Sequence, residues 1–80
     1  MNEKVGLTMR KSFMLEELDC AHCAAKMEDA IRKLEGVSHA SVNFMLQKLT
    51  LEADDSCFET VLDEAAAIIR KIEPDCRIVR

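Results

Sequence analysis

Apolar residues recur along the chain with two different periods, and the changes between them divide the sequence into elements. A short strand is predicted from residue 12 onward, because apolar side chains mark one of its faces: Phe13, Leu15 and Leu18. From Ala21 to Glu35 the spacing becomes that of a helix whose buried stripe holds Cys23, Met27, Ala30, Ile31 and Leu34. Gly36 follows directly, in the place where a left-handed residue commonly ends a helix.

The second half of the chain repeats this change of period. Residues 37–53 alternate with a period of two and predict a hairpin of half-buried strands with inward positions at Ala40, Val42, Phe44, Leu49 and Leu51. Ser56 and Glu59 have the spacing of a capping box, which predicts the start of a second helix there. Pro74 ends this helix, because proline lacks a backbone donor, and residues 76–80 form a last short strand.

The predicted order is strand, helix, strand, strand, helix, strand. This is a split βαβ arrangement of the α+β class, in which a four-stranded antiparallel sheet carries both helices on one face. Residues 1–10 show no sustained period and are interpreted as a flexible leader, so the domain itself spans residues 11–80. A chain of 80 residues has room for one small core and for no sizeable enclosed active site.

Charge and composition narrow the possible partners. A net charge of -4 gives no electrostatic reason to bind nucleic acid. No apolar run approaches the ~20 residues needed to cross a bilayer, and the N-terminus lacks the apolar core of a secretory signal. We therefore expect a soluble domain that does not insert into the membrane. Its four cysteines are too few for a typical disulfide-stapled secreted domain and favour a reducing, cytoplasmic location.

The segment Cys20-Ala21-His22-Cys23 carries the clearest chemical signal. It lies between the first predicted strand and the first helix, so its two sulfurs are one helical turn apart and can close on a single ion. Free backbone N–H groups and the positive end of the helix dipole favour thiolates there. Two thiolates suit Cu(I), Zn(II) and their heavier relatives better than hard ions. Cys20 and Cys23 are therefore the predicted metal ligands.

The sequence around this motif resembles the heavy-metal-associated (HMA) domains of metallochaperones and of metal-pumping P-type ATPases. The resemblance covers residues 12–80 and rests on three segments: residues 18–28 with their CxxC, Leu34-Glu35-Gly36-Val37, and Val42-Asn43-Phe44. It implies a ferredoxin-like βαββαβ sandwich that carries one metal ion and catalyses no reaction itself. The implied partner is the membrane domain of a metal-transporting ATPase, in cis or in trans.

Departures from the family pattern bear on the choice of metal. The family most often has Gly-Met-Thr before the first cysteine, whereas this chain has Glu17-Leu18-Asp19. An acidic residue at the position of Asp19 is similar to the zinc, cadmium and lead exporters, which implies Zn(II), Cd(II) or Pb(II) and a place at the N-terminus of such a pump. Near the end of the chain, Glu73-Pro74 stands where the family often has Gly-Tyr.

Three further residues have two interpretations each. Asp19 is a candidate third ligand, although aspartate is also a common helix cap. His22 is a candidate ligand or an exposed side chain, since neutral imidazole binds zinc well but the residue lies between the cysteines. Cys76 begins a strand expected beside the end of the first one, which would bring its thiol near the ion. Cysteine is also a frequent small core residue, which is the favoured interpretation of Cys76.

Two other functions remain open from the sequence. The chain could be a Cu(I) metallochaperone or a copper-ATPase domain, since two thiolates also satisfy Cu(I). A thiol-disulfide oxidoreductase is the less favoured alternative, because CxxC at a helix start is also a redox motif. Against it, no aromatic residue or proline lies inside the motif, and the chain ends on a strand.

Overall fold

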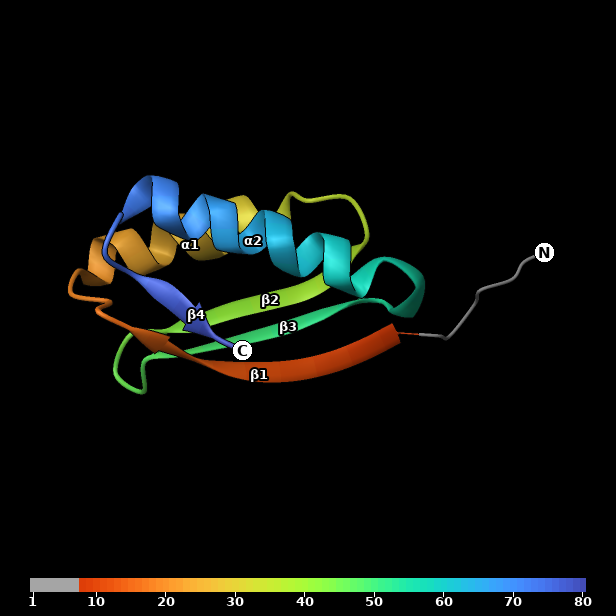
Figure 1. Ribbon diagram of the computed structural model, residues 1–80, viewed down its shortest axis with the longest axis horizontal. Helices are drawn as coiled ribbons and strands as arrows, with labels where there is room; N and C mark the ends of the chain where they lie inside the picture. The colour runs from red at the N-terminus through yellow and green to blue at the C-terminus, as the bar shows by residue number, and fades with distance from the viewer. Residues whose placement is uncertain (1–7) are drawn as a thin grey trace.

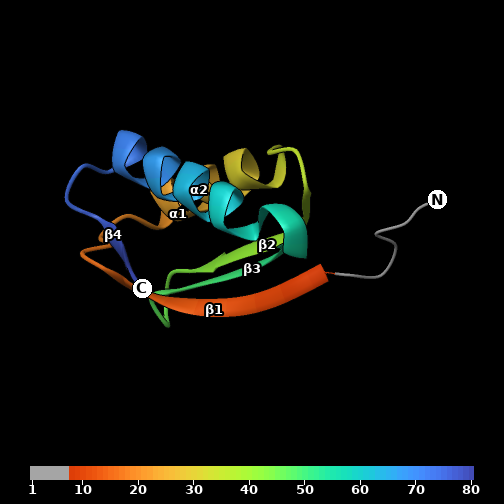
Figure 2. The ribbon, with the colours of Figure 1, turned by 45° about the vertical axis from the view of Figure 1, so that its right-hand side comes forward.

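In the computed structural model, residues 8–80 are described and form a four-stranded antiparallel sheet with α1 and α2 packed on one face (Figure 1). The elements are β1 (Thr8–Glu16), α1 (Ala21–Arg32), β2 (Val37–Asn43), β3 (Lys48–Asp54), α2 (Phe58–Ile72) and β4 (Arg77–Val79), with a short 3-10 helix, Asp55–Cys57, before α2. The strand order is β2-β3-β1-β4. The predicted α+β class and ferredoxin-like sandwich are confirmed. The turned view in Figure 2 shows that the helices leave the other face of the sheet open.

The core lies between the helices and the sheet. The helices contribute the apolar side chains predicted from their spacing: Met27 and Ile31 of α1 and Ile69 of α2 are at 0% exposure. The sheet contributes Leu49 and Leu51 of β3, which with β1 forms the centre of the sheet. These buried side chains come from both helices and from the sheet, so the core is built from the protein's own apolar residues.

The edge strand β2 is covered by side chains of α1. Glu28 Oε1 accepts a hydrogen bond from the Val42 N–H at 2.9 Å, and Arg32 Nε donates one to the Ala40 carbonyl at 2.9 Å. Glu28 and Arg32 also form an ion pair with each other, at 3.2 Å. These contacts satisfy backbone groups that an open sheet edge would otherwise present to other chains.

Two sequence expectations are corrected. β1 begins at Thr8 and pairs with β3 from Thr8 opposite Asp54 onward, so the expected leader extends too far into the domain; residues 1–7 lie outside the described residues. The predicted capping box is wrong as well. Ser56 lies inside the 3-10 helix, α2 begins at Phe58, and the cap position, Cys57, makes no side-chain capping bond. The 3-10 turn, rather than a serine hydroxyl, supplies the hydrogen-bond acceptor at this helix start: the Phe58 N–H donates to the Asp55 carbonyl.

Most of the remaining boundaries agree with the expectations. Gly36 has the expected left-handed φ of +94°, but α1 ends earlier than predicted, at Arg32 with Lys33 as its C-cap. The end of α2 is as predicted, at Ile72, just before Glu73 and Pro74. β4 pairs antiparallel with β1, with Glu16 opposite Arg77, so the start of the last strand lies beside the end of the first. No helix among residues 8–80 is long and apolar enough to cross a membrane.

Candidate metal centre

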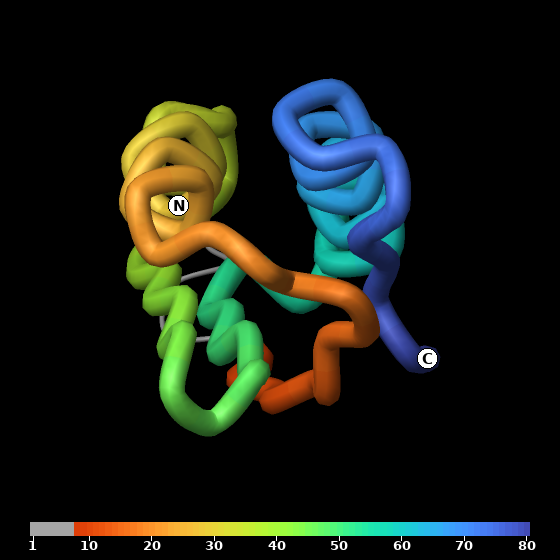
Figure 3. The backbone as a smooth tube through the Cα atoms, turned by 90° about the vertical axis from the view of Figure 1, so that its left-hand side faces the viewer, coloured from red at the N-terminus to blue at the C-terminus, as the bar shows by residue number. Residues whose placement is uncertain are grey.

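Three connections meet at one end of the molecule, the end that faces the viewer in Figure 3. The loop from β1 to α1 (residues 17–20, the β1–α1 loop) is held there by hydrogen bonds to the β2–β3 turn and to the α2–β4 connection. Leu18 N–H donates to Gln47 Oε1 at 3.2 Å, and Asp19 N–H donates to Glu73 Oε2 at 3.4 Å. The CxxC segment therefore lies at the rim of the sandwich, half-buried, rather than in its core.

Cys20 is the N-cap of α1. Its backbone is extended, with φ of -130°, and its Sγ accepts a hydrogen bond from the backbone N–H of Cys23 at 3.1 Å. This geometry explains why the helix begins at Ala21: the sulfur satisfies one of the free N–H groups of the first turn. The same turn brings Cys23 beside Cys20, as the spacing predicted.

The two thiols differ in acidity because of this contact. The pKa of Cys20 is lowered, first by the hydrogen bond from the Cys23 side chain and then by the bond from the Cys23 backbone N–H. The pKa of Cys23 is raised, mainly because its thiol donates to Cys20. Cys20 is thus the sulfur that becomes a thiolate first, and thiolates are the form that binds metal.

Asp19 is exposed, and Cys20 rather than Asp19 caps the helix. The two roles that the sequence left open for its carboxylate therefore do not compete, since no capping bond occupies it. His22 is exposed on the first turn of α1.

Glu73 is a residue of this end of the molecule that the sequence did not indicate. One of its carboxylate oxygens receives the Asp19 N–H, while the other, Oε1, is buried without a hydrogen-bond partner. Its negative charge raises the pKa values of Cys20, Cys23 and Cys76, although in each case it is not the largest influence. A buried carboxylate oxygen without a donor is costly, so this atom is suited to face a cation.

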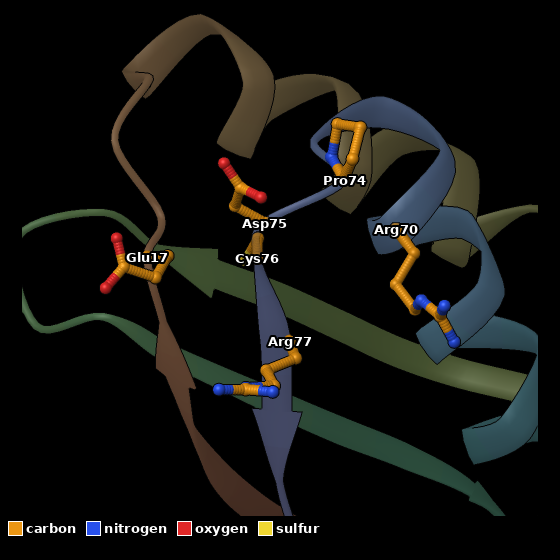
Figure 4. Close-up of a pocket in the computed structure, with 6 residues that line it drawn as sticks. All are labelled: Glu17, Arg70, Pro74, Asp75, Cys76 and Arg77. Atoms are coloured by element: carbon orange, nitrogen blue, oxygen red, sulfur yellow. The ribbon is translucent and has the colours of Figure 1, made fainter.

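Cys76 lies beneath the loop, with its side chain at 0% exposure within the core. Burial raises its pKa to about 11, and the charges of Glu73 and Asp19 add to the effect. A shallow pocket beside it is lined by Glu17, Arg70, Pro74, Asp75, Cys76 and Arg77 (Figure 4). Neither Cys20 nor Cys23 lines that pocket, so it is distinct from the thiol pair.

Cys57 lies at the other end of the molecule. Its Sγ packs against Gly36, where a Cβ atom would come within 2.8 Å of the sulfur. Gly36 follows α1, whose 12 residues extend ~18 Å at the usual rise per residue. Cys57 is therefore far from the thiol pair.

Among residues 8–80, no three His, Cys, Asp or Glu side chains are grouped closely enough to hold an ion together. The structure thus brings Cys20 and Cys23 together at the start of α1 without a third donor grouped with them. A third donor has to reach the ion by side-chain rotation, or has to come from water or a partner.

A small α+β sandwich with a thiol pair at the start of its first helix is typical of a class of compact metal-binding domains. The family model of the heavy-metal-associated domain matches residues 12–76, and the chain belongs to this family of metal-binding domains.

Its relatives include metal pumps of more than one specificity. It is 37% identical over 73 residues to the zinc/cadmium/lead-transporting P-type ATPase of Escherichia coli, covering 88% of this chain and 10% of that protein. It is 29% identical over 66 residues to the cadmium, zinc and cobalt-transporting ATPase of Bacillus subtilis, covering 82% of this chain and 9% of that protein. The chain thus spans about a tenth of the length of these curated relatives.

A solved structure shares both fold and sequence. The N-terminal domain of a potential copper-translocating P-type ATPase from Bacillus subtilis, in its Cu(I)-loaded state, superposes with a TM-score of 0.71 at 30% identity. The match covers 89% of this chain and 86% of that one. The similarity thus includes relatives named for copper as well as for zinc, cadmium and lead.

Proposed function

We propose that this domain carries one Zn(II), Cd(II) or Pb(II) ion on the thiolates of Cys20 and Cys23, with Asp19 as a further donor. The observation that carries the proposal is the placement of both cysteines at the start of α1, where Cys20 Sγ accepts a hydrogen bond from the Cys23 backbone N–H at 3.1 Å. Both sulfurs lie at the rim, where an incoming ion and an acceptor protein can reach them.

The choice of a divalent ion rests on the carboxylates around the thiol pair. A divalent ion prefers about four donors, whereas Cu(I) is satisfied by two thiolates. Asp19 is exposed and does not cap the helix, and Glu73 has a buried oxygen without a partner. Anionic oxygens near the sulfurs favour the divalent ions, and the names of two relatives agree with this choice.

The ion would be passed on by ligand exchange. With two or three protein donors the ion keeps an open position, so an acceptor's thiolate can bind it before the bond to Cys20 or Cys23 breaks. The ion then never becomes bare. In this proposal the chain is the N-terminal domain of a heavy-metal-translocating P-type ATPase. It faces the cytoplasm, passes its ion to the membrane domain, and catalyses no reaction itself.

Cu(I) carriage is the second candidate, because the chain shares its fold and 30% sequence identity with a relative whose structure is described as Cu(I)-loaded. Competitive titration under anaerobic, reducing conditions separates the two. One chromophoric competitor is used for Zn(II) and another for Cu(I), and Cys20→Ser and Cys23→Ser are titrated beside the unaltered protein. Zn(II) binding that survives either serine substitution would overturn the site. Selectivity for Cu(I) at cellular free-metal levels would overturn the metal class.

A further inference from the structure

Gln47 connects the β2–β3 turn to the β1–α1 loop. It is the last residue of the turn and has φ of 53°, a left-handed conformation that is unusual for a side chain of this size. Its backbone is fixed on both sides: its N–H donates to the Phe44 carbonyl at 3.3 Å, and its carbonyl accepts from the Leu15 N–H at 2.8 Å. The side chain therefore starts from a rigid position.

The carboxamide of Gln47 pairs with Leu18 as a peptide group pairs across a sheet. Its Oε1 accepts from the Leu18 N–H at 3.2 Å, and its Nε2 donates to the Leu18 carbonyl at 2.7 Å. The second Nε2 hydrogen reaches the Phe44 carbonyl at 3.1 Å. Both amide hydrogens and the amide oxygen are thus engaged, and this pattern fits only one orientation of the amide.

Leu18 is the point at which the loop is anchored. Its side chain is 2% exposed, so water has little access to the backbone groups that Gln47 satisfies. It lies between Glu17, whose φ of 62° is left-handed, and Asp19, which leads directly into Cys20. Fixing both backbone groups of Leu18 therefore fixes the direction in which the chain enters the thiol pair.

We propose that Gln47 is a positioning residue for the metal site: it holds the β1–α1 loop in the binding arrangement before the ion arrives. This inference rests on the proposed function of Cys20 and Cys23, since Gln47 acts through the loop and not on the ion. A loop that is already ordered loses less entropy when the ion binds, and ligands held by outer contacts bind more tightly.

The role requires an amide of this length. Glutamate has the same shape but, when ionised, no hydrogen to donate to the carbonyls of Leu18 and Phe44, and it would place a negative charge against both. Methionine fills the same space without hydrogen bonds. Gln47→Glu and Gln47→Met therefore remove the clamp and keep the volume.

The first experiment compares these variants with a matched control. Thr50→Val removes the hydrogen bond between Ser12 and Thr50, 3.2 Å long, which joins the neighbouring strands β1 and β3 and lies away from the loop. We expect Gln47→Met and Gln47→Glu to weaken Zn(II) binding about tenfold, in the range measured for residues that orient metal ligands. Thr50→Val should leave the affinity unchanged, even where it lowers the melting temperature equally.

The second experiment needs no variant. In the unaltered protein, the Leu18 amide and the Gln47 side-chain amide hydrogens should exchange slowly with solvent both without metal and with Zn(II). Protection that arises only after Zn(II) is added would show that the ion orders the loop, and would overturn the proposal. This readout stands even if both Gln47 variants fail to fold.

The outcomes separate the inference from the function on which it rests. Loss of Zn(II) binding in Cys20→Ser and Cys23→Ser, together with unchanged affinity in Gln47→Met, would reject the positioning role and keep the site. Retained Zn(II) binding in the serine variants would reject the site itself, whatever the Gln47 variants show.

Discussion

Cys20 Sγ accepts a hydrogen bond from the backbone N–H of Cys23 at 3.1 Å, so a proposed metal ligand is also the residue that caps α1. An ion bound to this sulfur would share it with the helix start. Sulfur is a large, polarisable acceptor, and a thiolate keeps further lone pairs when one of them faces an N–H group. The cap and the ion therefore depend on the same side chain, and substitutions of Cys20 act on both.

Helix stability and metal binding should separate in the Cys20 variants. Serine is a preferred N-cap, so Cys20→Ser should melt at or above the temperature of the unaltered metal-free protein. Cys20→Ala should melt lower, because alanine leaves the Cys23 N–H without its acceptor. Both should lose most Zn(II) affinity. Thermal melts by circular dichroism and competitive titration test this. Equal melting temperatures for the serine and alanine variants would argue against the capping role.

Cys20 should react with alkylating agents at lower pH than Cys23. The pKa of Cys20 is lowered by the contacts from Cys23, and the pKa of Cys23 is raised by the same contact. Because the thiolate is the nucleophile, iodoacetamide added to the metal-free protein at increasing pH should label Cys20 first. Peptide mapping by mass spectrometry identifies the labelled residue, and Cys57 and Cys76 serve as internal references. Preferential labelling of Cys23 would contradict the assignment.

Asp19→Ala should lower Zn(II) affinity about tenfold and leave Cu(I) affinity nearly unchanged, because the divalent ion gains from an anionic oxygen and Cu(I) does not. The melting temperature of the metal-free protein should not fall, since Cys20 makes the cap. Paired titrations with both ions test the change in selectivity. A variant that loses stability and keeps its Zn(II) affinity would assign Asp19 a structural role instead.

Glu73→Gln should also weaken Zn(II) binding, while keeping the acceptor for the Asp19 N–H. The substitution removes the charge beside the sulfurs and replaces the carboxylate whose Oε1 is buried without a partner. Glu64→Gln is a suitable control, because Glu64 is exposed and lies near Cys57, at the end of the molecule remote from the thiol pair. Isothermal titration of both variants under identical conditions gives the comparison, and equal affinities would exclude a role for Glu73.

Features that follow from a regular spacing of residues could be predicted from the sequence. Met27 and Ile31 are buried because helical spacing alone fixes which residues share a face, and the change of period after Gly36 marks the start of β2 at Val37. The thiol pair was equally visible, because Cys20 and Cys23 are close in the chain and need only one helical turn to meet.

Features that depend on contacts between distant segments were not visible. Gln47 and Glu73 look like ordinary polar residues of a turn and a helix end, and only the folded chain brings them to Leu18 and Asp19. The start of β1 was missed for a similar reason. Thr8 joins the sheet through its pairing opposite Asp54, and such backbone pairing leaves no apolar period to detect.

Cys76 should not contribute to metal binding at neutral pH. The sequence left Cys76 either near the ion or in the core; the start of β4 does lie beside the end of β1, but the side chain is fully buried in the core. A buried thiol remains protonated, and a protonated thiol is a poor ligand. Cys76→Ala should therefore change the Zn(II) affinity by no more than about twofold. Loss of a residue that binds or orients the ion would lower the affinity about tenfold or more. A tenfold loss would identify Cys76 as a ligand.

The same burial predicts how Cys76 affects stability at high pH. Its pKa is raised from 9.0 to about 11 in the folded protein, so between these values the unfolded chain has released a proton that the folded chain keeps. The unfolded state then binds fewer protons, and the free energy of unfolding falls as the pH rises. Below the unfolded pKa both states hold the proton and the effect vanishes. Urea denaturation of the metal-free protein at pH values across this range measures the slope, and Cys76→Ala should show a shallower one than the unaltered protein. Identical slopes would mean that the thiol ionises in the folded protein as readily as in the unfolded chain, and that the core does not shield it.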